Sequence, residues 1–189
     1  MPGTVIGQSM NLGYPGTYAR GGDSVIMSRI VNPTDTTGPS FGDPVILNAG
    51  SSSALGVGDA SGAPTYSKMG AGGTMAAFAG VATRKVMQVS GSYLDQNTQA
   101  YTPGENCEVL ERGSISVVCN VGNPNTISTG VYVRITANAG VPAGVVGGFE
   151  ARTDNDSGNC ILITNAKWTT GVIDANGVTE LTILSRNLP

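Results

Sequence analysis

The residue types that most often carry out catalysis are scarce in this chain. It contains no histidine, which removes the Ser-His-Asp arrangement and the Cys-His pair of nucleophilic enzymes. A serine and a lysine are adjacent at Ser67 and Lys68, but neighbouring residues on a strand point to opposite faces and would not act together. The sequence therefore favours a protein without a catalytic nucleophile.

Three glutamates form the densest acidic group, at Glu105, Glu108 and Glu111. A pair of carboxylates at the right separation can hydrolyse a glycosidic bond. On a strand over residues 107–112, however, Glu108 and Glu111 would fall on opposite faces. We interpret them as charges on a solvated strand surface. A small serine- or carboxylate-based hydrolase is kept as an alternative that a serine-reactive probe would expose.

No pattern in the sequence completes a metal or cofactor site. Residues 154–159 resemble the start of a calcium loop, but residues 160–162 are apolar and the bidentate glutamate that such a loop needs is absent, so we expect an Asx-rich turn. The glycine-rich stretch 70–74 completes neither the Walker nor the dinucleotide-binding pattern. The cysteines lack zinc spacing, and we expect three buried, reduced thiols at Cys107, Cys119 and Cys160. Catalytic residues, metals and cofactors are therefore all predicted to be none.

The surface of this protein is unusually neutral. Charged residues make up 12% of the 189 residues and the net charge is −3, whereas an average chain is about 25% charged. There is no run of Lys and Arg that would neutralise phosphates, so nucleic acid is not an expected partner. No apolar run approaches the ~20 residues of a membrane span, and the first residues lack the regions of a signal peptide. We expect no membrane partner and assembly in a cytoplasm.

The chain reads as a series of strands separated by turns. Its 28 glycines and 10 prolines argue against a helical bundle, and short apolar alternations recur between turn signals. The predicted strands cover residues 24–31, 43–47, 85–89, 107–112, 114–119, 131–135, 160–163 and 178–184. The pattern predicts an all-β fold nearly without helix, either a compact β-sandwich or a β-barrel of jelly-roll-like character.

Two parts of the chain do not fit this pattern. Residues 1–24 are punctuated by Gly and Pro yet carry scattered apolar groups, so we predict an extended N-terminal arm that docks on a partner. Residues 25–189 form the predicted β-rich domain. Within it, residues 48–73 are rich in Gly, Ser and Ala and are expected to be an irregular loop region with a short strand near residues 55–57.

Several segments, in this order, resemble the structural cement proteins of tailed bacteriophages. They cover most of the chain: Gly13–Arg20, Phe41–Val45, Phe78–Ala82, Tyr101–Glu105 running into Val109–Ile115, and Ile163–Trp168. The resemblance implies a capsid decoration protein that has no catalytic residues and binds the assembled major capsid protein. It implies a place on the outer capsid surface of the virion, after assembly in the cytoplasm of the bacterial host.

A homo-oligomer is expected as well. The low charge and the apolar pattern on both faces of residues 178–184 suggest buried surface beyond one monomer core. The preference for a homotrimer comes from the resemblance alone, and a dimer stays open.

The arm supplies the predicted contacts with the capsid or with another subunit. Aromatic and apolar groups dominate interface energetics, and an arginine there would pair with an acidic group; the residues are Ile6, Leu12, Tyr14, Tyr18 and Arg20. We expect Trp168, the only tryptophan, to be a core anchor. The alternative function is a carbohydrate-binding or adhesin-like β module of a head fibre or tail, for which Trp168 with Tyr132 is the only candidate platform.

Overall fold

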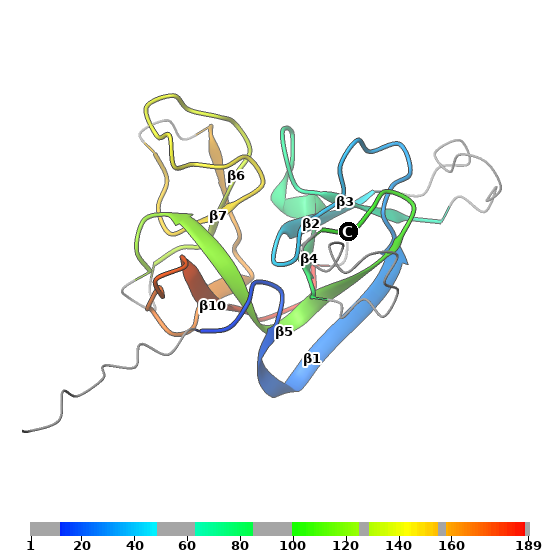
Figure 1. Ribbon diagram of the computed structural model, residues 1–189, viewed down its shortest axis with the longest axis horizontal. Helices are drawn as coiled ribbons and strands as arrows, with labels where there is room; N and C mark the ends of the chain where they lie inside the picture. Colours follow the sequence, from blue (N-terminus) through cyan, green and yellow to red (C-terminus); the bar gives the residue numbers. More distant parts are fainter. Residues whose placement is uncertain (1–11, 49–62, 85–99, 125–128, 155–157, 188–189) are drawn as a thin grey trace, which may run out of the picture.

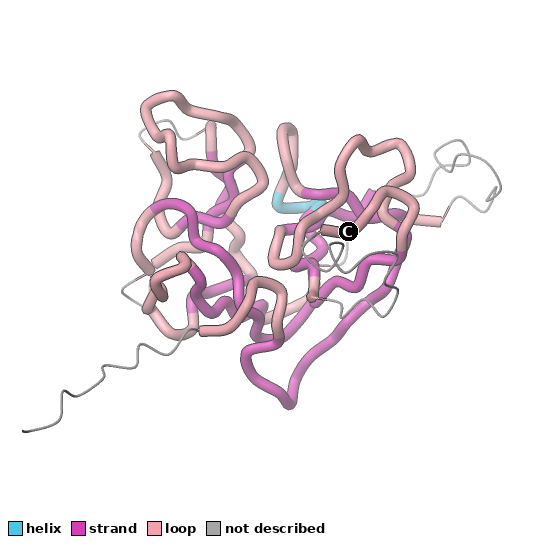
Figure 2. The backbone as a smooth tube through the Cα atoms, in the orientation of Figure 1, coloured by secondary structure: helices cyan, strands magenta, loops and turns pink. Residues whose placement is uncertain are grey.

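The computed structural model describes residues 12–48, 63–84, 100–124, 129–154 and 158–187. These residues form ten strands and one short 3-10 helix, η1, so the all-β prediction is confirmed. Figure 2 shows how little of the described chain is helical. The elements are β1 (Tyr18–Ile30), β2 (Pro44–Asn48), β3 (Thr65–Lys68), η1 (Met75–Ala77), β4 (Phe78–Ala82), β5 (Asn106–Val121), β6 (Tyr132–Arg134), β7 (Phe149–Glu150), β8 (Cys160–Leu162), β9 (Ala166–Trp168) and β10 (Val178–Ile183).

The long strand β5 connects the whole molecule. It pairs antiparallel with β1, β4 and β10 and parallel with β7. We expected two strands here, separated at Gly113, but the chain continues through that residue as one strand. Gly113 has φ +123°, and a Cβ there would lie 3.2 Å from the Cα of Ser24. The glycine thus marks a close crossing with β1 rather than a break between strands.

Two groups of strands flank β5. One contains β2, β3 and β4, and the other contains β6, β7 and β8, as Figure 1 shows on its two sides. A single bridge between Val31 and Tyr66 ties the chain after β1 to β3. The sheet is not closed into a barrel, and the fold is sandwich-like, which decides between the two predicted architectures.

The buried apolar residues of the described chain form two cores. The larger core gathers residues from β4, β5, β6, β7 and β10 around the fully buried Trp168. The smaller core includes Phe41, Tyr66 and Tyr101. Adjacent residues of β5, Val109 and Leu110, enter different cores because successive side chains on a strand point to opposite faces. One strand therefore stabilises both cores.

Three sequence-based boundaries differ from the structure or lie outside it. β1 begins at Tyr18, so the boundary that we placed after residue 24 falls inside a strand. Within the region 48–73, residues 65–68 form β3, whereas residues 55–57 lie outside the described residues. The strand predicted over 85–89 also lies outside them. The division into an arm and a β domain stays a prediction.

Strand β10 is covered on both faces within one chain. Five of its six residues are buried, and it lies between β5 and β9. We took its two-sided apolar pattern as a sign of an oligomer, but β10 is covered by its own chain, so this pattern does not support the oligomer, which stays a prediction.

Candidate attachment surface

The segment 12–17, which we call the arm root, is held against the body of the protein by its backbone. The N–H of Leu12 donates to the carboxylate of Asp174 at 3.1 Å, and the hydroxyl of Ser116 donates to the Leu12 carbonyl at 3.1 Å. The N–H of Gly16 donates to the Ser116 carbonyl at 2.7 Å, and the Ser116 N–H donates to the Thr17 carbonyl at 2.9 Å. The arm root therefore extends the pairing of β1 with β5.

Close packing at two glycines fixes the arm root further. Gly16 has φ +81°, and a Cβ there would lie 2.8 Å from the Arg84 nitrogen and 3.0 Å from the Phe41 Cβ. Gly42 has φ +85°, and a Cβ there would lie 2.9 Å from Pro15. The Arg84 N–H also donates to the Gly16 carbonyl at 2.7 Å. Side chains would not fit at either position, so glycine permits this docking.

Asp174 is the charged group that receives the start of the arm root. Its carboxylate accepts the backbone N–H groups of Asn176, Val178 and Leu12. Desolvation raises the pKa of Asp174, but these hydrogen bonds to the charged form outweigh it, and the pKa lies below its ordinary value. The ionised carboxylate is thus part of the anchor.

The predicted interface residues are only partly gathered in one place. Tyr14 is 65% exposed and belongs to the arm root, as does the half-buried Leu12. Tyr18 is 46% exposed and begins β1 opposite Ile115. Arg20 lies in β1, opposite Ser114. Ile6 lies outside the described residues. Exposed tyrosines on an anchored backbone are the feature that an attachment surface needs.

Arg84 is a residue of this candidate surface that sequence reasoning missed. Its guanidinium carbon lies 4.9 Å from the ring centroid of Tyr14. The two residues are far apart in the chain, and no local pattern marks Arg84 as special. Only the docking of the arm root against the end of β4 brings them together.

A buried group of charges, the Arg134 cluster, lies elsewhere and consists of Arg134, Glu150 and Asp154. Arg134 Nε and Nη2 donate to the two oxygens of Glu150 at 2.5 and 2.9 Å, and Nη1 donates to Asp154 at 2.9 Å. The side chains of Arg134 and Glu150 are fully buried. Hydrogen bonding to Glu150 raises the pKa of Arg134. This is a bidentate, fully desolvated ion pair.

The Arg134 cluster has a structural role. Asp154 Oδ2 also accepts amide N–H groups from Asn138 at 3.0 Å and Asn159 at 3.1 Å. A carboxylate oxygen surrounded by N–H donors is arranged unlike a calcium ligand. Residues 155–157 of the predicted turn lie outside the described residues. Among the residues that the structure describes, no group of three His, Cys, Asp or Glu side chains could hold a metal ion.

Glu111 is not the solvated charge that we expected. It is 7% exposed, accepts the Tyr66 hydroxyl at 3.2 Å and accepts Arg186 Nε at 2.6 Å. Next to Arg186, the side chain of Asn187 donates to the carbonyls of Met75, Ala76 and Phe78. Glu111 therefore fastens the C-terminal segment to β5. Its burial depends on contacts with distant parts of the chain that strand alternation does not reveal.

The remaining candidate nucleophiles have structural surroundings. Ser67 is buried and accepts Asn48 Nδ2 at 2.7 Å, whereas Lys68 pairs with Asp43 at 2.8 Å. Their separation on the two faces of β3 agrees with the prediction. The three cysteines are buried free thiols, as expected. Burial raises the pKa of the Cys119 thiol to about 11 and, with the charge of Glu150, that of Cys160 to about 11. Such thiols stay protonated and unreactive.

Trp168 is fully buried in the larger core. Its indole N–H donates to the Gly130 carbonyl at 3.0 Å, and it lies opposite Leu181 in the pairing of β9 with β10. Its ring offers no exposed face to a sugar.

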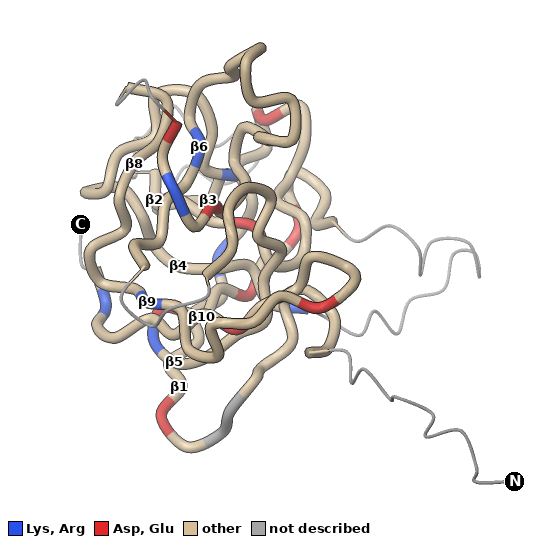
Figure 3. Tube along the Cα trace, turned by 90° about the vertical axis from the view of Figure 1, so that its left-hand side faces the viewer, with Lys and Arg blue, Asp and Glu red and all other residues tan. Residues whose placement is uncertain are grey.

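Charged positions in the described part of the chain are sparse and scattered over the molecule, as Figure 3 shows. Among the described residues there is also no helix long and apolar enough to cross a membrane.

Comparison with known proteins agrees with this picture. The family model described as structural cement protein (E217 gp24/Pam3 gp6) matches residues 1–184. A solved chain from the structure titled "The capsid of Myoviridae Phage XM1" shares the fold with a TM-score of 0.57, at 15% identity, over 98% of both chains. No curated protein sequence matches the chain. The family is that of a structural capsid protein and not an enzyme, and its location is the virion. This chain belongs to the structural cement protein family of phage capsids.

Proposed function

We propose that this protein binds the assembled major capsid protein lattice on the outer surface of a tailed-phage head and stabilises that lattice. It is made and assembled in the cytoplasm of the bacterial host. Many copies on one lattice would multiply individually weak contacts into a high avidity. The observation that carries the proposal is the arm root, a backbone segment anchored to β5 and Asp174 that holds Tyr14 at the surface.

The sequence that precedes the arm root supports an attachment role. Residues 1–11 contain Val5, Ile6 and Met10 among glycines and a proline. A segment of this kind loses roughly 1–2 kcal/mol of conformational free energy per residue when it orders. It must therefore bury its apolar groups against a partner. The arm root fixes the point at which this segment joins the body of the protein.

A homotrimer is the oligomer that we propose, with a dimer as the second candidate. Support comes from the membership of a cement family and from the low proportion of charged residues, which suits a surface covered by neighbours. Light scattering at micromolar concentration measures the mass directly. A mass of one 19.1 kDa chain, both alone and after release from capsids, would contradict this part of the proposal.

The glycan-binding alternative finds no favourable observation. It needs an exposed aromatic platform, yet Trp168 is fully buried and Tyr132 is half-buried in β6. The exposed tyrosines belong instead to the arm root and the start of β1. Binding of the intact protein to a glycan array, at a strength that Tyr132→Ala abolishes, would reverse this preference.

Co-sedimentation tests the proposed function. Full-length protein is mixed with mature capsids that lack it and, in parallel, with unassembled capsid subunits. We expect it to sediment with capsids, to raise their melting temperature and to leave free subunits unbound. The matched variant lacks residues 1–11 only, because residues 12–17 hydrogen-bond to the body and a longer deletion would damage the fold. This variant should keep its circular dichroism spectrum and lose most of its binding; wild-type occupancy by it would refute attachment through the arm.

A further inference from the structure

The guanidinium of Arg84 is held by a set of aromatic rings. Its central carbon lies 4.9 Å from the ring centroid of Tyr14 and 5.6 Å from that of Phe41. Phe41 packs edge-on against Tyr101, with centroids 5.3 Å apart, and the Tyr101 hydroxyl donates to the Thr83 carbonyl at 2.8 Å. The cation therefore has a preset position before any partner arrives.

Among the described residues, no carboxylate pairs with this cation. Four cations of the described chain each contact a carboxylate: Lys68, Arg112, Arg134 and Arg186. Arg84 makes no ion pair within the described residues, and neither do Arg29, Arg152 and Lys167, but Arg84 alone of these stacks on the exposed Tyr14 of the arm root. Arg84 Nη1 is buried and has no hydrogen-bond acceptor among the described residues. An arginine carries five N–H donors that fit a carboxylate bidentately. The guanidinium is thus left with unused capacity to donate.

The surroundings of Arg84 allow a partner to reach it. Phe41 is the inner ring and is 8% exposed, whereas Tyr14 is the outer ring and is 65% exposed. Tyr14 is therefore the exposed member of the ring pair, and an arriving group would approach the guanidinium past its side chain. The backbone beneath stays fixed, because the arm root is pinned through Gly16 and Leu12. Rigid support of this kind lowers the entropy lost on binding.

We propose that Arg84, framed by Tyr14 and Phe41, binds the carboxylate of an Asp or Glu side chain of the major capsid protein. The inference rests on the proposed function and names the partner's chemistry at its attachment surface. Sequence reasoning assigned this role to Arg20, but we favour Arg84, whose guanidinium is positioned by the rings and whose Nη1 has no acceptor among the described residues. A carboxylate is favoured over phosphates because binding a phosphate array takes a cluster of cations, and this surface presents one positioned arginine in a chain of net charge −3.

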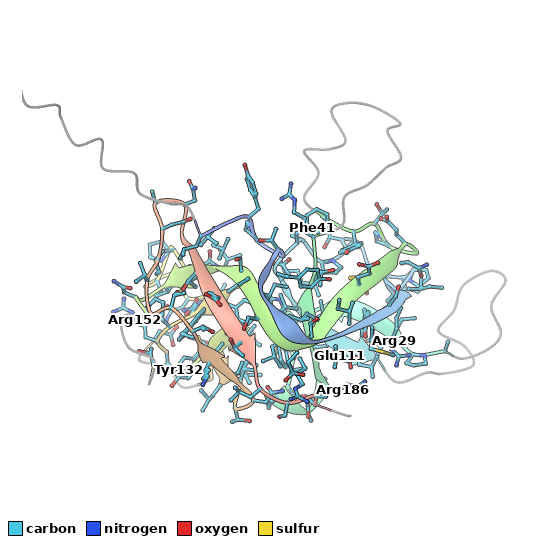
Figure 4. All side chains as sticks on the ribbon, turned by 90° about the horizontal axis from the view of Figure 1, so that it is seen from below. Arg29, Phe41, Glu111, Tyr132, Arg152 and Arg186 are labelled. Atoms are coloured by element: carbon cyan, nitrogen blue, oxygen red, sulfur yellow. The ribbon has the colours of Figure 1, made fainter. Side chains whose placement is uncertain are left out.

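The first test is a titration of full-length variants against capsids that lack the protein. Arg84→Glu should weaken binding at least tenfold, which is about 1.4 kcal/mol, because it places two carboxylates together. Arg84→Lys keeps the charge but loses the planar guanidinium, so its capsid affinity should lie between those of wild type and Arg84→Glu. Arg152→Glu is the matched control, since Arg152 is exposed and is labelled at the left edge of the molecule in Figure 4, away from Phe41 near its middle. The control should change binding by less than twofold.

The outcomes separate the two proposals. If wild-type protein fails to bind capsids, the proposed function is wrong and the Arg84 inference falls with it. If wild-type protein binds and Arg84→Glu binds as Arg152→Glu does, only the inference is overturned. Circular dichroism and melting temperature establish that each variant is folded, and Arg84→Lys, which retains the aliphatic stem, gives a result even where Arg84→Glu is unstable.

A cross-linking experiment identifies the partner group. A photoreactive benzoylphenylalanine replaces Tyr18, which is exposed and is not one of the two rings that contact Arg84. The cross-linked capsid peptide is then identified by mass spectrometry. We expect a capsid peptide with an Asp or Glu, and reversal of that residue to Arg should restore binding of Arg84→Glu. Cross-links only to a second copy of this chain, or no rescue by any acidic residue of the peptide, would overturn the inference.

Discussion

Arg84 and Arg134 are the same residue type in opposite situations. Arg134 is fully buried and donates to Glu150 and Asp154 within its own chain. Arg84 rests on aromatic rings at the edge of the protein, and its Nη1 has no acceptor in the described chain. The first arginine has its donors satisfied by folding, so it contributes to stability and specificity of the fold. The second has donors left over, so it is suited to a partner.

The largest predicted effect concerns Arg134, whose guanidinium donates to two carboxylates of its own chain. Glu150→Ala leaves the guanidinium of Arg134 buried without its bidentate partner, and breaking a buried pair in this way destabilises a protein by about 3–5 kcal/mol. Chemical denaturation measures the loss. The double variant Arg134→Met/Glu150→Leu removes the bidentate pair, leaves Asp154 its two amide donors, and should therefore recover part of the stability. Equal losses in the single and double variants would show that apolar packing, and not the unpaired charge, sets the effect.

Trp168→Phe should lower the free energy of unfolding by a smaller amount, and it changes no charge. The phenyl ring fills most of the same space but cannot donate to the buried carbonyl of Gly130, and an unsatisfied buried acceptor costs about 1–3 kcal/mol. The free energy of unfolding should fall by that amount while capsid binding at low temperature stays unchanged. Weaker binding with unaltered stability would move Trp168 from the core to the attachment surface.

Asp174→Asn tests the anchor of the arm root, and its effect depends on pH. Because the folded pKa of Asp174 lies below its ordinary value, the ionised carboxylate stabilises the protein above the unfolded pKa, which is about 3.9. That contribution is lost as pH falls through the folded pKa. Wild type should therefore be modestly more stable than Asp174→Asn at pH 7 and equally stable at the lowest pH. A stability difference that is constant with pH would contradict this assignment.

Tyr14→Ala should have the smallest effect on stability. The ring is mostly exposed, and surface substitutions are usually within about 0.5 kcal/mol. Capsid affinity should nevertheless fall, because the outer part of the Arg84 frame is removed. Tyr132→Ala is the matched control, since this tyrosine comes from β6, outside the attachment surface. Equal affinity in the two variants would show that Tyr14 is not a binding residue.

The strands were predictable from sequence because alternation is a local signal. The alternating residues Ile115, Val117, Val131 and Val133 of the predicted strands 114–119 and 131–135 are all fully buried. Gly113 misled the prediction, because a glycine looks the same in sequence whether it ends a strand or permits a close crossing. Contacts between residues far apart in the chain leave no local pattern in the sequence. Glu111 and Arg134 sit at positions that alternation assigns to a solvated face, and only loops and termini from elsewhere in the chain cover them.

We assign capsid attachment to the region around Arg84 and fold stability to the Arg134 cluster. The most direct test of this assignment is hydrogen–deuterium exchange of the full-length protein, free and bound to capsids. We predict that binding slows backbone exchange in residues 12–18 and around Phe41 and Arg84, and leaves residues 132–154 around the Arg134 cluster unchanged. Slower exchange confined to residues 132–154, with none at the arm root, would contradict the account, because the capsid would then contact the side of the molecule that we assign to stability alone.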